Sequence, residues 1–168
     1  DIVNDIRALR TPGAIDAVAS HPSCGVCLMH MQGHPGTMQR AVHYADVVSE
    51  VVGFLGQRAD IVRKRGVAPA RIVLDPGIGF GKTAEHNLPL ARRQRELLTL
   101  GYPLLLGWSR KGLLGQLTGR PVGERMVASV ALAVTRDVHT SEDIAQETFL
   151  SAWQRIGQLG NPQSFLPW

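Results

Sequence analysis

The stretch LDPGIGFGKT, residues 74–83, places an aspartate at the end of an apolar run and follows it with a glycine-rich loop. The stretch ends in GKT, as a phosphate-binding loop would. Such a loop also needs a glycine five positions before its Gly-Lys-[Ser/Thr] ending. Pro76 stands at that position, and proline has no N–H to offer a phosphate. A nucleoside triphosphate loop is therefore excluded, and Asp75 needs another explanation.

The residues at or just past the ends of the other apolar runs are mostly polar. They are Asn4 and Asp5, then Met29 and His30, and then Ser109, Arg110 and Lys111. In folds built of parallel strands, chemistry gathers at the carboxyl ends of the strands. We therefore expect the side chains of Asn4, Asp75 and Lys111 to converge at the carboxyl ends of the strands.

The elements that would position these residues are strands that alternate with helices. We expect strands at Val3, 25–31, 71–74 and 103–106, and helices at 11–19, 41–65, 85–100 and 122–134. The strands are nearly continuous apolar runs, which is typical of parallel strands buried on both faces. The long helix at 41–65 carries one apolar stripe, formed by Val47, Val48, Val51, Val52, Leu55, Ala59 and Val62. The pattern predicts an α/β fold, and both a (β/α) barrel and a doubly wound sheet fit it.

A metal site at Cys24 and Cys27 is the second chemical possibility. These residues form a C-x-x-C, with His30 and His34 close behind. However, the segment reads as a strand, so Cys27 and His30 should point to opposite faces. A second cysteine pair is absent from the sequence. We therefore expect buried or half-buried thiols and no metal bound by these residues.

The bulk properties set mild limits on the protein. The chain has 168 residues, a net charge of +4 and 44% hydrophobic residues. This length allows one domain with a hydrophobic core, and the charge mildly favours anionic ligands such as phosphates. No apolar run reaches the ~18 residues of a membrane span, and no secretory signal is recognisable. We therefore expect a cytoplasmic protein.

The alternation of strands and helices stops after Val134, so we expect a boundary between 1–134 and 135–168. Thr140 and Asp143 form a capping box, which predicts a helix over 141–157.

The motifs DIVNDI, CLMHMQG, LDPGIGFGK and GWSRK, in this order and spacing, resemble dihydropteroate synthase over 1–134. The resemblance implies a (β/α)8 TIM barrel. It also implies a transferase of folate biosynthesis and a sulfonamide target. The reaction would join 6-hydroxymethyl-7,8-dihydropterin diphosphate to p-aminobenzoate and release pyrophosphate.

The resemblance implies a role for each matching residue. Asn4 and Asp75 would hold the polar edge of the pterin, and Met29 would line its slot. The other substrate-binding residues would be Gly79, Phe80, Gly107, Ser109 and Lys111. Lys111, Asp75 and Arg110 would be the catalytic residues.

The residue types agree with these roles. A pterin presents an amino group beside a ring N–H, and a carboxylate such as Asp75 accepts both hydrogen bonds. Lys111 and Arg110 would stabilise the charge on the leaving pyrophosphate. The alternatives are that Asp75 only forms a turn, that Met29 only packs in the core, and that the two basic residues are solvated surface charges.

The sequence also departs from the family. Its first three strands and its last strand have no counterpart, which leaves about four βα units where a closed barrel has eight. The family uses Mg²⁺, whose protein ligand would lie in the missing first strand. We therefore expect this chain to bind a pterin without turnover. A homodimer, in which a second copy supplies the missing strands, remains open.

The segment SEDIAQETFLSAW, followed by FLPW, resembles region 2 of a sigma-70-family factor of the extracytoplasmic type. This second resemblance implies RNA polymerase as an alternative partner through 135–168. A third alternative is an inactive fusion of two fragments.

Overall fold

The computed structural model describes residues 1–38, 42–107, 115, 119 and 121. The helices that we predict at 122–134 and 141–157, and the boundary near residue 135, lie outside these residues.

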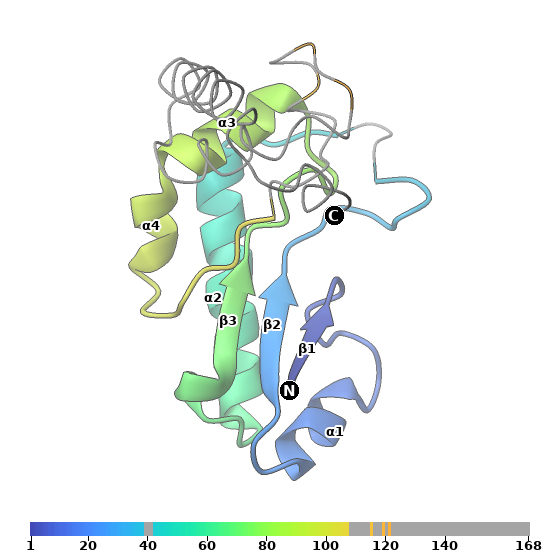
Figure 1. Cartoon of the computed structure of the whole chain (residues 1–168), viewed down its shortest axis with the longest axis vertical. Helices are drawn as coiled ribbons and strands as arrows, with labels where there is room; N and C mark the ends of the chain where they lie inside the picture. Colours follow the sequence, from blue (N-terminus) through green and yellow to red (C-terminus); the bar gives the residue numbers. More distant parts are fainter. Residues whose placement is uncertain (39–41, 108–114, 116–118, 120, 122–168) are drawn as a thin grey trace, which may run out of the picture.

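The centre of the fold is a sheet of three parallel strands in the order β1-β2-β3 (Figure 1). The strands are β1 Ile2–Asp5, β2 Gly25–Met29 and β3 Ile72–Asp75. Helices follow the strands, so the prediction of an α/β fold with a parallel sheet is confirmed. Two strand ends differ slightly from the prediction, because β2 ends at Met29 rather than residue 31, and β3 includes Asp75.

The fourth predicted strand, 103–106, is wrong as a strand and is reduced to one parallel bridge between Leu74 and Leu104. Leu74 donates its N–H to the carbonyl of Pro103 at 2.9 Å and accepts from the N–H of Leu105 at 2.8 Å. The pairing stops there because the next residue of the ladder would be Pro76, which has no N–H. The direction of pairing is nonetheless the predicted one.

The longest helix, α2 Val47–Lys64, begins later than the predicted residue 41. Asp46 caps it, because its carboxylate accepts from the N–H of Val48 at 3.1 Å and from the hydroxyl of Ser49 at 2.7 Å. The predicted apolar stripe is confirmed, since all of its members are buried except the half-buried Val52. Gly66, at φ 98°, follows the helix end as expected.

The helix predicted at 85–100 is wrong as a single element and forms α3 Ala84–Arg92 and α4 Gln94–Leu98. Pro89 lies inside α3 and cannot donate to the preceding turn, which weakens the helix locally. The break falls at Arg93, whose guanidinium pairs with Asp46 at 2.9 Å and with Glu96 at 2.7 Å. The hydrogen bonds that Asp46 accepts, first from Arg93 and then from Ser49, hold its pKa well below its usual range. Arg93 thus ties the start of α2 to α4.

Two short elements complete the described fold. They are α1 Ala14–Ser20, close to the prediction, and the 3₁₀ turn Pro69–Arg71 that leads into β3. No helix in the described ranges is long and apolar enough to cross a membrane.

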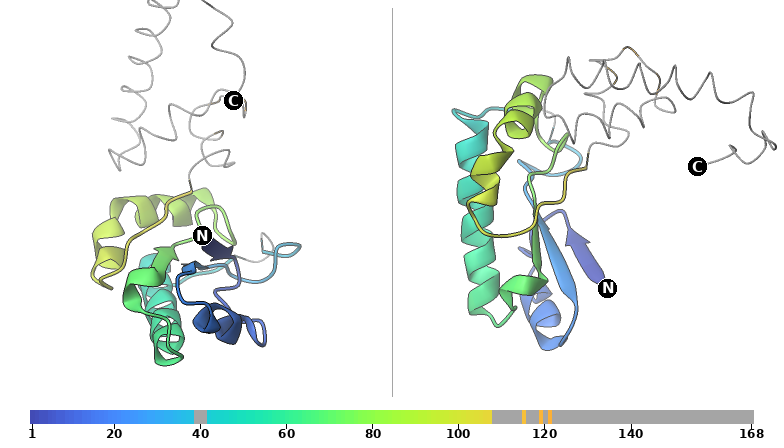
Figure 2. Two further views of the ribbon diagram at one scale, coloured as in Figure 1. Left: turned by 60° about the horizontal axis from the view of Figure 1, so that its bottom comes forward. Right: turned by 60° about the vertical axis from the view of Figure 1, so that its left-hand side comes forward.

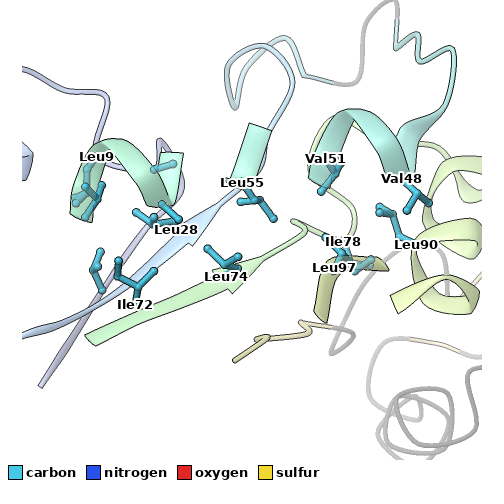
Figure 3. Packing of buried hydrophobic residues seen from close by; sticks show 14 of the residues in the cluster. Leu9, Leu28, Val48, Val51, Leu55, Ile72, Leu74, Ile78, Leu90 and Leu97 are labelled. Atoms are coloured by element: carbon cyan, nitrogen blue, oxygen red, sulfur yellow. The ribbon is translucent and has the colours of Figure 1, made fainter. Parts of the chain in front are cut away.

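The core lies between the sheet and α2 (Figures 2 and 3). In the right-hand view of Figure 2, α2 and α4 lie on one side of the strands. Leu28 and Leu74 from the sheet pack with Leu55 of α2, and all three are fully buried. Each such leucine contributes roughly 1.5–3 kcal/mol by its burial. Because strand residues alternate between faces, the opposite face of the sheet carries the intervening residues.

Candidate functional site

Three of the residues that the sequence marks for ligand binding lie on the same face of the sheet. The register pairs Asn4 with Cys27, and Met29 with Asp75. Paired residues of parallel strands point to the same face, and Cys27 and Met29 are two positions apart on β2. Asn4, Met29 and Asp75 therefore all point away from α2. Asn4 is exposed, whereas Met29 and Asp75 are buried.

Asp75 ends β3 with its backbone and side chain both engaged. Its carbonyl accepts from the N–H of His30 at 2.9 Å, which joins it to the chain just after β2. Its Oδ1 accepts from the N–H of Gly77 at 2.7 Å. The side chain is only 5% exposed, and a buried carboxylate at a strand end is a common feature of binding sites.

The loop after Asp75 lies directly against the segment after β2. Gly77 has φ 68°, and a Cβ there would collide with the carbonyl oxygen of His30. Gly81 has φ 62°, and a Cβ there would lie 2.7 Å from the carbonyl oxygen of Gln32. Both positions therefore require glycine, for the backbone conformation and for the close approach.

The same loop is held by polar side chains from beyond it. The N–H of Gly79 donates to Oδ1 of Asn87 at 2.9 Å, and the hydroxyl of Tyr44 donates to the carbonyl of Gly81 at 2.8 Å. Asn87 lies on α3 and is only 2% exposed. The loop conformation is thus fixed from α3 and from the segment before α2.

Lys82 ends the loop and points inward rather than towards solvent. It is only 3% exposed. Its Nζ lies 3.1 Å from the carbonyl oxygens of Gly77 and Phe80, 3.3 Å from that of His30, and 2.9 Å from Nδ1 of the His30 ring. This arrangement agrees with the exclusion of a phosphate loop, because the amine is directed at protein carbonyls.

The ring of His30 is buried among aromatic side chains. Its centroid lies 5.0 Å from that of Phe54, at right angles, and 6.1 Å from that of Tyr44. Burial, the charge of Lys82 and more weakly that of Arg10 lower the pKa of His30 from 6.5 to about 3. The imidazole is therefore neutral at physiological pH. Because an ammonium can only donate, Nδ1 is the acceptor and Nε2 carries the proton.

The two cysteines are free thiols, as expected. Cys24 is half-buried, and Cys27 is fully buried on the face of the sheet that carries Asn4 and Asp75. Burial, reinforced by the charge of Asp75, raises the pKa of Cys27 to about 12. Within the described ranges, no group of three or more His, Cys, Asp or Glu side chains could hold a metal ion.

The remaining predicted site residues fall into two groups. Gly79, Phe80 and Gly107 are described and half-buried, and a Cβ at Gly107 would meet no atom within 4 Å. Ser109, Arg110 and Lys111 lie outside the described residues, so their convergence with Asp75 stays a prediction.

Sequence reasoning gave no role to Lys82 or to His30. In the sequence, the lysine stands out only as part of a failed phosphate motif. No local signal in the sequence marks this lysine as buried, because the pairing of β2 and β3 is what brings His30 and Gly77 to it.

Comparison with known proteins identifies two regions of the chain. Residues 1–138 match the family described as "Pterin binding enzyme", and residues 124–168 match the family described as "Sigma-70 region 2". The dihydropteroate synthase of Neisseria meningitidis serogroup C is 44% identical over 165 residues, which cover 94% of this chain and 58% of the relative.

Solved structures of dihydropteroate synthases are also similar to this chain. The dihydropteroate synthase of Stenotrophomonas maltophilia, with imidazole bound in its active site, has a TM-score of 0.75 and 42% identity over 95% of this chain and 63% of that one. The Burkholderia cenocepacia dihydropteroate synthase complexed with 7,8-dihydropteroate has a TM-score of 0.71 and 38% identity, with the same two coverages.

These comparisons confirm both resemblances that the sequence motifs indicated. The chain spans about 58% of the length of the curated relative described above. With a family match over 1–138 of its 168 residues, the chain belongs to the pterin binding enzymes.

Proposed function

We propose that this chain carries the pterin site of a dihydropteroate synthase-type transferase. The observation that carries the proposal is the position of Asp75, a buried carboxylate at the end of β3 that shares one sheet face with Asn4 and Met29. The Burkholderia relative binds 7,8-dihydropteroate, the compound that the proposed condensation forms.

The carboxylate of Asp75 suits the polar edge of a pterin. That edge presents an amino group beside a ring N–H, and an ionised acceptor strengthens each hydrogen bond. Asn4 adds an amide on the same face, and Met29 offers an apolar, polarisable surface beside Asp75. Gly79, Phe80 and Gly107 would border the pterin and p-aminobenzoate.

The reaction itself is a displacement at carbon. The amine nitrogen of p-aminobenzoate bonds to the methylene carbon of the pterin and gives up one proton to solvent, while the C–O bond to the diphosphate breaks and pyrophosphate leaves with the bonding electrons. Lys111 and Arg110 would stabilise the departing charge, and Ser109 would face p-aminobenzoate. These three roles rest on the motif GWSRK and on the resemblance alone.

A Mg²⁺ ion is part of what the resemblance implies. Among the described residues, no His, Cys, Asp and Glu side chains gather in a group of three or more that could ligate a metal.

The proposal assigns the pterin-binding part to 1–134, as about four βα units of a TIM barrel, and a separate segment to 135–168. The two family matches support this division, since they meet and overlap over 124–138.

We expect the chain to act in the cytoplasm and to bind a pterin without the turnover of a complete synthase. A homodimer and an RNA polymerase contact through 135–168 are further predictions from the sequence.

The proposal is tested by mixing the purified full chain with 6-hydroxymethyl-7,8-dihydropterin diphosphate and p-aminobenzoate. Bound pterin is measured by quenching of its fluorescence, and turnover by pyrophosphate release. We expect saturable pterin binding with little or no pyrophosphate. A folded chain that leaves the pterin fluorescence unchanged, even at protein concentrations well above the Kd of ordinary ligand complexes, would overturn the proposal.

A further inference from the structure

We propose that Lys82 is a positioning residue that fixes the direction of the Asp75 carboxylate. This inference rests on the proposed pterin site, because it assigns a function to the loop that follows Asp75. The part of it that concerns the loop can be tested without any ligand.

Lys82 joins two separate segments of backbone through one amine. Its Nζ contacts the carbonyl oxygens of Gly77 and Phe80 within the loop, and the carbonyl oxygen and Nδ1 of His30 after β2. Charge-assisted hydrogen bonds of this kind are stronger than neutral ones, and more so in a buried site. The lysine therefore fastens the loop after β3 to the end of the neighbouring strand.

Gly77 is the residue through which this fastening reaches Asp75. Its carbonyl faces Lys82 at 3.1 Å, while its N–H donates to Oδ1 of Asp75 at 2.7 Å. The carbonyl of Gly77 also accepts from the N–H of Phe80 at 3.0 Å, which closes a tight turn. Both polar groups of Gly77 are thus engaged, so a change at Lys82 alters the donor that orients the carboxylate.

Another role for Lys82 is disfavoured by its surroundings. A lysine that meets a diphosphate has to direct its amine at the ligand, whereas this amine faces three carbonyl oxygens and a ring nitrogen. A lysine that only covers apolar surface keeps its charged end in water, yet Lys82 is 3% exposed. The contacts fit a residue that organises the loop.

The test compares Lys82→Met in the full chain with Lys64→Met, which removes an exposed lysine from the last turn of α2. Two signals are followed by ¹⁵N NMR, the amide of Gly77 and Nδ1 of His30. Urea unfolding, measured in parallel, shows whether each variant is folded. Pterin affinity is measured by quenching of the fluorescence of 6-hydroxymethyl-7,8-dihydropterin diphosphate.

In Lys82→Met we expect both NMR signals to move and the Gly77 amide to exchange faster with solvent, while pterin affinity falls at least about tenfold. Lys64→Met should leave all three unchanged. If Lys82→Met does not fold, Lys82→Gln carries the comparison, because its amide keeps two donors for the carbonyls but loses the charge.

A folded variant whose Gly77 and His30 signals stay in place, or whose pterin affinity stays within about twofold of the parent chain, would overturn the proposal. If the parent chain itself binds no pterin, the proposed function fails. The two NMR signals then decide for or against Lys82 on their own.

Discussion

Gly77 and Asp75 hold each other in one fixed arrangement. The N–H of Gly77 donates to Oδ1 of Asp75 at 2.7 Å, and the position where a Cβ of Gly77 would lie is occupied by the carbonyl oxygen of His30. The carboxylate that we assign to the pterin therefore depends on a position that only glycine can fill.

This dependence predicts a large loss of stability in Gly77→Ala. The left-handed conformation costs a residue with a Cβ about 1–2 kcal/mol, and the clash with His30 adds roughly 1–3 kcal/mol. Gly101 offers the matched control, since it has φ 79° but a Cβ added there would meet no atom within 4 Å. Gly101→Ala should therefore lose only the free energy that the left-handed conformation costs, without a clash. The two free energies of unfolding are measured in urea, and equal losses would contradict the close approach.

The sequence alone predicted the parts of the fold whose signal lies within one element. The apolar stripe of α2 repeats at helical spacing, and the runs of β2 and β3 are continuously apolar. The same reasoning placed Asp75, Met29 and Asn4 at strand ends. It failed at Arg93 and Leu104, where the outcome depends on partners distant in sequence or on a missing N–H at Pro76.

The role of Lys82 was hidden for a similar reason. Its partners His30 and Gly77 come together only once β2 and β3 have paired. No local pattern distinguishes an inward lysine from an outward one after a glycine turn. Such a residue becomes visible only when both the register and the close approach of the loop are known.

The burial of His30 predicts a loss of stability in mild acid. Its pKa in the folded chain is about 3, below the ordinary value of 6.5, so the unfolded chain binds the proton more readily. The stability that a neutral His30 allows is present above pH 6.5 and is lost as the pH falls towards 3. The slope for one proton is at most about 1.4 kcal/mol per pH unit.

Urea unfolding from about pH 7.5 down to about pH 4.5 measures this slope before the carboxylates titrate. In His30→Gln the slope over that range should be smaller, because the proton-binding site is gone. His34→Gln, at an exposed histidine, should keep the pH slope of the parent chain. A parent chain whose stability is flat over this range would contradict the buried neutral imidazole.

The two thiols should differ in reactivity. Cys27 is fully buried and its pKa is raised to about 12, whereas Cys24 is half-buried. At about pH 8, iodoacetamide should modify one thiol in the folded chain and both in denaturant, because the thiolate is the reactive form. Mass spectrometry of the peptides identifies the labelled residue. Cys24→Ser should abolish labelling of the folded chain, and rapid labelling of Cys27 would show that its face of the sheet is open.

The central claim is that Asp75 recognises the pterin, and it is tested most directly by pterin titration of Asp75→Asn beside Asp5→Asn. Both changes replace a carboxylate at the carboxyl end of a strand. Asp5 pairs with Leu28 and so points to the α2 side, where its carboxylate accepts from the N–H of Leu9 at 2.7 Å. Asp75→Asn keeps an oxygen for the N–H of Gly77 but loses the charged acceptor for the pterin edge.

We predict that Asp75→Asn remains folded by urea unfolding and no longer binds the pterin, while Asp5→Asn binds it within about twofold of the parent chain. A folded Asp75→Asn that binds the pterin as tightly as the parent chain would contradict the account.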